Sequence, residues 1–274
     1  CHFMPFFSLP MYDWPEIREA TDAWARGLAR HLRSRGFPDA PDAVSRLSDY
    51  RMLWRASDLL LSQSCGYPLT HEYSRRLMPV ATPHYAAEGC RGPRYSSSVL
   101  VRSADSLGGA GDLRGRVCAI NDRESMSGML ALKLIFAPLA RKGDFFSRTI
   151  ETGSHVESLL ALQQGRADVC AIDAVCMALA RRYRPELLSG LVEIARSPLV
   201  PGLPLVTSAA RSREQIGRLR EALAAAFADS ELQRERDALF LEGFSILEPA
   251  DYAIIAKLEG DLRLRGDLNL WQAA

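Results

Sequence analysis

The stretch TGSHVESLLALQQGRADVCAID, residues 152–173, places charge-capable side chains at the ends of two expected elements. Ser154 and His155 stand at the start of a helix, and Asp173 ends the strand that follows. Ser154 and Glu157 have the spacing of a capping box, which is a sufficient structural reason for the serine. A charged His155 is unfavourable at a helix N-terminus unless an anion is present, and a neutral, hydrogen-bonding histidine is the alternative. If the helix start and the strand end face each other, they form a small site in which Ser154 and His155 meet an anion and Asp173 meets a cation.

A second group of polar side chains lies in ESMSGMLAL, where an apolar helix is expected to begin. Ser125 and Ser127 stand at this helix start, and Gly128 allows a close approach of the backbone. A helix N-terminus offers N–H groups and a partial positive charge, and the two hydroxyl groups add donors for an oxyanion. An ordinary serine N-cap is the structural alternative. The stretch has no P-loop lysine, which argues against a nucleoside triphosphate.

The tetrapeptide VCAI occurs twice, each time with a polar residue after it. Asn121 follows the first copy, residues 117–120, and Asp173 follows the second, residues 169–172. Buried parallel strands have this composition, and ligands bind beyond their carboxyl ends. The equivalent placement of the two residues favours a binding site, although both could instead cap the helices that follow.

Apolar strand-like stretches alternate with helical patterns along the chain. The helical patterns carry apolar residues at helical spacing, and several end at glycine, as WPEIREATDAWARGLARHLRSRG does. The expected strands lie in FFSLPMY, DLLLSQS, LMPVATPHY, SSSVLVR, RVCAIN, ADVCAID, LVEIARS and LPLVTS. This alternation predicts an α/β fold with mainly parallel sheets.

The composition is that of a soluble globular protein, with 47% hydrophobic and 24% charged residues among 274. The 34 basic residues balance 33 acidic ones, giving a net charge of +1, so no nucleic-acid partner is expected. No stretch reaches the roughly 18 apolar residues that a membrane span needs. The six cysteines show no metal-binding spacing, so we expect no metal site.

The N-terminal stretch CHFMPFFSLPMYDWPE lacks the features of an intact secretory signal. Either export does not occur or a signal was removed, and Cys1 is either a lipid-bearing cysteine or the edge of a fragment. Cys65 and Cys90 both lie in glycine-flanked, loop-like stretches, so they could pair in an oxidising compartment. Three further cysteines lie in apolar runs, where burial is expected: Cys118, Cys170 and Cys176.

Several motifs, taken together and in order, resemble the PhnD-type substrate-binding proteins of ABC transporters for phosphonate, phosphite and phosphate. The resemblance rests on SGMLAL, TGSHxxSLxAL and GxADVxAID and runs from about Ser8 to about Ser208. It implies a two-lobed type II periplasmic binding protein fold, in which each lobe is a mainly parallel sheet flanked by helices and the ligand binds between the lobes. It also implies that lobe 1 comprises residues 1–102 and 202–274, with lobe 2 inserted as residues 103–201.

The resemblance assigns ligand-binding roles to specific positions. Carried over to this sequence, these positions are Tyr12, Tyr67, Tyr95, Ser125, Met126, Ser127, Gly128, His155 and Asp173. The serines, the glycine and the histidine would hold an anion, the tyrosines would form an aromatic wall, and the aspartate would recognise an amine. Met126 departs from the serine-threonine-serine run typical of phosphonate binders, which removes one hydroxyl donor.

Two functions from different classes are compatible with these features. The first is a solute-binding protein that captures a small phosphonate-like ligand, an oxyanion or a zwitterion with an amine, for ABC transport. The second is a biosynthetic or hydrolytic enzyme on the same two-lobed fold. No Cys/His or Ser/His/Asp signature is visible, so we assign no catalytic residue and no cofactor. We expect a periplasmic monomer that meets an ABC permease if it is exported, with a cytoplasmic location as the alternative because no signal peptide is visible.

Overall fold

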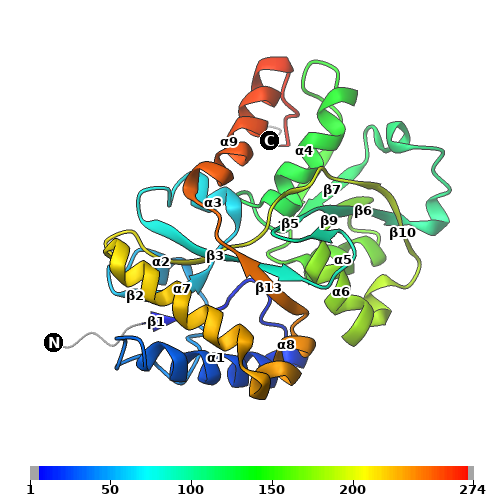
Figure 1. Cartoon of the computed structure of the whole chain (residues 1–274). Coiled ribbons are helices and arrows are strands. Elements are labelled where there is room, and N and C mark those ends of the chain that lie inside the picture. Colours follow the sequence, from blue (N-terminus) through cyan, green and yellow to red (C-terminus); the bar gives the residue numbers. More distant parts are fainter. Residues whose placement is uncertain (1–5, 271–274) are drawn as a thin grey trace. The chain divides into compact units, whose positions relative to one another are not determined.

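The protein is described here by a computed structural model over residues 6–270, which divides into two compact units. The first unit comprises the described residues up to Ala86 together with Arg91–Pro93 and Pro201–Tyr252. The second comprises Ala87–Cys90, Arg94–Val200 and the described residues from Ala253 onward. Each unit has its own sheet and its own helices (Figure 1), so the expected two-lobed α/β fold is confirmed. Cys1 lies outside the described residues.

The first unit is built on a five-stranded sheet in the order β1-β2-β12-β3-β13. Its strands are β1 (Phe6–Phe7), β2 (Leu59–Gln63), β3 (Leu77–Tyr85), β12 (Leu205–Ser208) and β13 (Leu241–Ser245). β1 and β2 pair in parallel, whereas the other neighbours are antiparallel.

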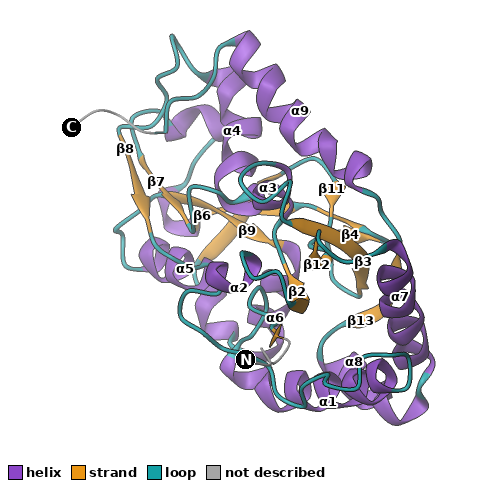
Figure 2. Ribbon diagram, turned by 90° about the vertical axis from the view of Figure 1, so that its left-hand side faces the viewer, coloured by secondary structure: helices purple, strands orange, loops and turns teal. Residues whose placement is uncertain are grey.

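The helices of the first unit include a packed group formed by α1, α7 and α8, which lie side by side in Figures 1 and 2. The α-helices are α1 (Arg18–Arg33), α2 (Arg51–Trp54), α3 (Gly66–Thr70), α7 (Arg213–Ala228) and α8 (Gln233–Ala238), with 3-10 turns η1 (Pro15–Ile17) and η7 (Ser230–Leu232). α1 buries Trp24, Leu28 and Leu32, which recur at helical spacing and face the core. Burial of this apolar stripe stabilises α1 far more than its intrinsic helix propensity does.

The second unit is built on a five-stranded sheet in the order β10-β6-β9-β7-β8. Its strands are β6 (Ser97–Arg102), β7 (Val117–Ile120), β8 (Arg148–Glu151), β9 (Val169–Asp173) and β10 (Leu191–Arg196). β9, β7 and β8 run parallel to one another, whereas β6 is antiparallel to both of its neighbours.

A helix begins just after each of the three parallel strands of the second unit. η4 (Met126–Leu130), a short π-helix, continues as α4 (Ala131–Phe136) after β7; α5 (His155–Gln163) follows β8; and α6 (Ala174–Tyr183) follows β9. Because parallel strands end at the same edge of a sheet, all three helix starts lie along one edge. The unit also contains η2 (Ser103–Asp105), η3 (Ala110–Leu113), η5 (Ala137–Leu139) and η6 (Pro185–Leu188).

Both five-stranded sheets are mixed, so the predicted mainly parallel sheets are wrong in that detail. The strands that run against the others are β6 in the second unit and β12 and β13 in the first. β6 and β12 follow segments where the chain changes unit, whereas β13 follows α8 within the first unit. A parallel pair needs a crossover, which is usually a helix packed on the same sheet. β6 and β12 enter their sheets from the other unit and lack that helix, so the sequence pattern of a buried strand did not reveal their direction.

The boundaries between the units also differ from the expected ones, which lay between residues 102 and 103 and between residues 201 and 202. β6 was expected to lie in lobe 1, but it pairs with β9 and β10 and belongs to the second unit. The segments in which the chain changes unit form a small sheet of β11 (Val200–Pro201), β5 (Arg94–Tyr95) and β4 (Cys90–Arg91). α9 (Pro249–Arg265) starts in the first unit and continues in the second, which is a change of unit that was not predicted.

The C-terminal segment after α9 is anchored on the second unit. The buried Lys133 ammonium lies 2.9 Å from the Asp267 carboxylate, and Asn269 N–H donates to the Gly143 carbonyl at 2.8 Å. Leu268 and Leu270 are buried. The anchor therefore combines one ion pair, one backbone hydrogen bond and two apolar side chains.

The cysteines of the described residues are all in the thiol form. Cys65 and Cys90 form no disulfide, which corrects the hypothesis that they pair. The three cysteines from apolar runs are buried as expected: Cys118, Cys170 and Cys176. Within residues 6–270, no helix combines the length and the apolar character that spanning a membrane requires.

The ion pair of the C-terminal anchor should respond unequally to loss of its two partners. Asp267→Ala should lower the free energy of unfolding by about 2–3 kcal/mol, because it leaves a charge on Lys133, which is only 7% exposed. Lys133→Met should cost less than about 1 kcal/mol, because Met keeps the apolar stem and Asp267 is partly exposed. Denaturant unfolding measures both.

The exposed pair Lys257–Asp261 on α9 is the matched control. Asp261→Ala should leave the unfolding midpoint unchanged, because exposed pairs are screened by water. Equal losses from the two changes at the buried pair would contradict the asymmetry.

Candidate anion-binding site

Ser125 caps the helix that begins after β7. Its hydroxyl oxygen accepts a hydrogen bond from Gly128 N–H at 2.9 Å, and its backbone is extended, as an N-cap requires. The sequence suggested that the N–H groups around Gly128 bind an anion, but the Gly128 N–H is used for this cap. The first helical turn is a π-turn, a rare geometry that is frequent at functional sites.

Ser127 connects this helix start to the start of α5. Its hydroxyl oxygen lies 2.8 Å from His155 Nε2 and 3.3 Å from the Ser125 hydroxyl oxygen. Ser154 caps α5 as expected, accepting from Glu157 N–H at 3.1 Å, so His155 is the first helical residue. The structure thus brings together Ser125, Ser127 and His155, which lie up to 30 positions apart in the sequence (155 − 125 = 30).

His155 is held in its neutral form. Burial lowers the pKa of His155 to about 4, and a backbone hydrogen bond involving Ala171 opposes the shift only in part. The residue keeps a little solvent contact, but its Nδ1 atom is buried and makes no hydrogen bond of good geometry to the described residues. A neutral ring avoids the unfavourable interaction of a cation with a helix N-terminus. This is the neutral, hydrogen-bonding histidine considered as the alternative from sequence.

Gly128 is a position where any side chain would force its neighbour Asn121 to move. A β-carbon added there would lie 1.8 Å from Asn121 Oδ1 and 3.0 Å from Asn121 Cγ. The Asn121 amide therefore packs directly against the backbone of the first helical turn. The neighbouring Met126 is 1% exposed, and its side chain carries no N–H or O–H group that could donate to a ligand.

Asp173 serves as the N-cap of α6. One carboxylate oxygen accepts from Val175 N–H at 2.7 Å and from Cys176 N–H at 3.3 Å, and the residue is 1% exposed. Backbone N–H groups at a helix start stabilise the buried negative charge. This geometry matches the capping alternative for Asp173, and an amine contact finds no support in it.

The three candidate tyrosines have different environments. Tyr95, on β5, is only 3% exposed. Tyr67, on α3 of the first unit, stacks on His71 with ring centroids 3.9 Å apart and an interplanar angle of 8°. Tyr12, also in the first unit, meets Tyr85 edge to face at 5.3 Å. The ligand contacts assigned to these tyrosines stay a prediction.

Tyr85 and His71 were not singled out from sequence. Gln63 Nε2 donates to the Tyr85 hydroxyl at 2.9 Å and so fixes the ring against which Tyr12 packs. His71 follows Tyr67 by four positions, a spacing that brings side chains together on a helix. That spacing was a usable signal for the stacked pair, whereas the Tyr12–Tyr85 contact depends on sheet order.

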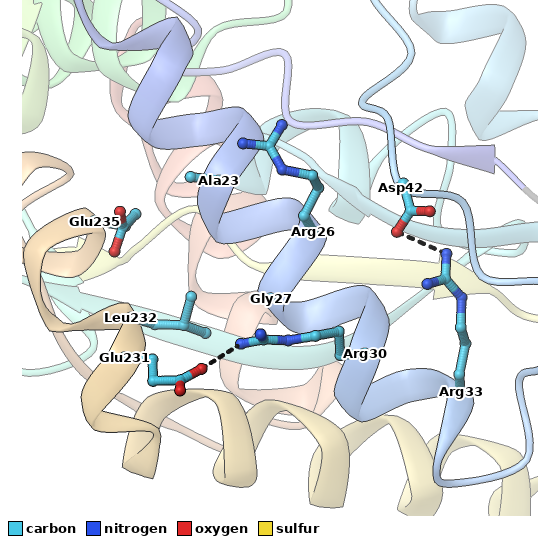
Figure 3. Close-up of a pocket in the computed structure, with 9 residues that line it drawn as sticks. All are labelled: Ala23, Arg26, Gly27, Arg30, Arg33, Asp42, Glu231, Leu232 and Glu235. Atoms are coloured by element: carbon cyan, nitrogen blue, oxygen red, sulfur yellow. Dashed lines mark hydrogen bonds and ion pairs between the residues drawn. The ribbon is translucent and has the colours of Figure 1, made fainter.

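A concave surface of about 530 Å³ lies in the first unit between α1 and the η7–α8 segment (Figure 3). It is lined by Ala23, Arg26, Gly27, Arg30, Arg33, Asp42, Glu231, Leu232 and Glu235. Arg33 pairs with Asp42 at 2.8 Å, and Arg30 pairs with Glu231 at 3.3 Å. Because the groove contains as many carboxylates as guanidinium groups, it does not favour an anion. No cluster of three His, Cys, Asp or Glu side chains suited to a metal occurs within residues 6–270.

The buried neutral histidine should make stability depend on pH. The pKa of His155 is 6.5 in the unfolded chain and about 4 in the folded protein. The stability that the neutral ring contributes is therefore fully present above pH 6.5 and is lost as the pH falls towards 4. The loss should be on the order of 2 kcal/mol, below the full value of the shift because the residue keeps some solvent contact. In His155→Gln, the fall in melting temperature between about pH 7 and pH 4.5 should be smaller. Identical pH profiles for the two proteins would contradict this.

Comparison with known proteins gives a family and a set of similar folds. The family model described as "ABC transporter, phosphonate, periplasmic substrate-binding protein" matches residues 9–252. A comparison with curated protein sequences gives no match.

The solved structures with similar folds share little sequence identity with this chain. A binding protein component of an ABC phosphonate transporter, PA3383 from Pseudomonas aeruginosa, aligns with a TM-score of 0.73 at 17% identity, over 97% of this chain and 90% of its own. PhnD1 from Prochlorococcus marinus, in complex with methylphosphonate, has a TM-score of 0.72 at 14% identity, over 95% and 98% of the two chains. XAC2383 from Xanthomonas citri, bound to chloride ion, has a TM-score of 0.71 at 16% identity, over 96% and 98%. These likenesses show the fold. Because the family model matches most of this chain, the chain belongs to the family of phosphonate ABC transporter periplasmic substrate-binding proteins.

Proposed function

We propose that this solute-binding protein captures a small phosphonate-type oxyanion through Ser125, Ser127 and His155 of its second unit. The observation that carries the proposal is the chain of contacts at the two helix starts, with Ser127 Oγ 2.8 Å from His155 Nε2 and 3.3 Å from Ser125 Oγ. Hydroxyl groups at a helix N-terminus are good donors to an oxyanion. The ligand class also follows from family membership.

In this proposal each hydroxyl oxygen accepts a hydrogen bond from the protein and donates its own hydrogen to the ligand. Ser125 Oγ accepts from Gly128 N–H. Ser127 Oγ accepts from His155 when the neutral ring carries its proton on Nε2, the tautomer that we propose for the ligand-bound protein. The 3.3 Å contact between the two hydroxyl groups uses one O–H in the ligand-free protein, and we propose that this hydrogen turns to the anion on binding. Both hydroxyl groups then donate to the anion, and hydrogen bonds linked in this way strengthen one another.

The alternative of an enzyme is less well supported by the same contacts. A serine nucleophile needs a base and a third group that orients the base. Ser127 and His155 are close enough for the first two roles, but no carboxylate among the described residues is bonded to the histidine ring. The arrangement suits binding without chemistry. Family membership adds a periplasmic location and an ABC permease as the acceptor of the ligand, which we include in the proposal.

The capping geometry of Asp173 bears on the ligand's second end. A carboxylate that accepts two N–H groups of α6 and is almost fully buried is poorly placed to pair with an amine. We therefore propose that the oxyanion group is the feature that this protein recognises, and that an amine on the ligand is tolerated without being selected.

The anion contact can be tested with methylphosphonate and isothermal titration calorimetry. His155→Ala and Ser127→Ala should each weaken binding by roughly tenfold to a hundredfold, because hydrogen bonds to a charged group contribute about 1.5–3 kcal/mol. The double variant should lose little more than either single variant, because the two residues act as one unit. Unchanged affinity in both single variants would refute the site.

The role of Asp173 can be tested with a pair of ligands. Asp173→Asn keeps an oxygen that can cap α6 but removes the charge. We expect the ratio of affinities for 2-aminoethylphosphonate and methylphosphonate to be the same as in the original protein. A selective loss of affinity for the aminoalkyl ligand would show that Asp173 recognises an amine and would contradict the capping role as its only one.

A further inference from the structure

Asn121 occupies a fixed position between the two helix starts of the anion site. It follows β7 directly, and its carbonyl oxygen accepts from Gly153 N–H at 2.9 Å. The preceding Ile120 carbonyl accepts from both the backbone N–H and the hydroxyl of Thr152, at 2.9 and 3.0 Å. These bonds tie the end of β7 to the loop that leads into α5, so the backbone of Asn121 has little freedom.

The side chain of Asn121 is oriented by its packing against Gly128. The amide oxygen Oδ1 lies where a β-carbon on Gly128 would be, and it is buried without a hydrogen bond to any described residue. Asn121 as a whole is partly exposed. With Oδ1 turned to the glycine, the amide nitrogen Nδ2 is the polar atom of this side chain left to meet solvent or a ligand.

A helix-capping role does not account for Asn121, although the sequence allowed one. Asp122 Oδ1 accepts from Glu124 N–H at 2.7 Å, and Ser125 caps the helix itself. Both capping tasks of this turn are therefore performed by other residues. A buried carbonyl without a hydrogen bond costs free energy. A contact of the amide nitrogen, at the other end of the group, would offset this cost.

The oxyanion head of a phosphonate has three oxygens, whereas the helix start supplies two side-chain hydroxyl groups. Met126 has no donor, and Gly128 N–H is used by the cap. We infer that Asn121 donates from Nδ2 to the bound oxyanion and supplies the third side-chain donor of the site. This inference rests on the proposed function and adds a specificity-determining residue to it. An amide nitrogen donates whatever the pH, so this contact holds a charged head group without titrating.

The test uses the full chain and methylphosphonate. Asn121→Leu preserves the volume beside Gly128 but removes the donor, and it should weaken binding by about tenfold. Asn121→Asp preserves the shape but replaces the donor by a carboxylate, so it should weaken binding further. The melting temperature of each ligand-free variant shows whether the fold is retained.

Thr152→Val is the matched control, because it loosens the same loop without touching a donor that faces the ligand. It should change the affinity by less than about twofold. Retained affinity in both Asn121 variants would overturn the inference and leave the proposed function intact. A loss of affinity in Thr152→Val as large as that in Asn121→Leu would have the same meaning. An original protein that binds neither methylphosphonate nor inorganic phosphate would overturn the proposed function and the inference with it.

Discussion

The hydrogen bond between Ser127 and His155 exists because β7 and β8 are parallel neighbours in one sheet. Each strand leads into a helix, and parallel strands deliver those helix starts to the same edge. Two positive helix ends are thereby brought close together, which is unfavourable unless something with negative charge or electron density lies between them. Two hydroxyl groups and a neutral imidazole occupy that space, and we propose that a bound anion completes it.

The neutrality of His155 follows from the same constraint. A protonated ring would add a positive charge to a region that already contains two helix N-termini, and burial removes the water that could offset it. In the proposed site, dipoles and not a full positive charge would hold the ligand. Dipoles fixed by the backbone need no rearrangement when the ligand arrives, which favours rapid and reversible capture.

The sequence carried the signals that depend on local chemistry. The helix starts at Ser125 and Ser154, the two VCAI strands and the two-lobed fold could all be predicted, because caps, periodicity and motif order are readable along the chain. Asp173 shows the limit of this reasoning, because an aspartate after a buried strand looks the same whether it caps a helix or meets a ligand. The direction of β6, the unit boundaries and the contact of Asn121 with Gly128 depend on long-range pairing, for which one sequence gives no direct signal.

The anchoring of the C-terminal segment on the second unit has a consequence for folding kinetics. Lys133 and Asp267 lie 134 positions apart, and the stretch between them includes Pro201–Tyr252 of the first unit. Their ion pair and the burial of Leu268 and Leu270 can therefore form only after a long loop has closed, which costs chain entropy. Contacts between residues so far apart in sequence slow folding, so we expect this anchor to form late on the folding pathway.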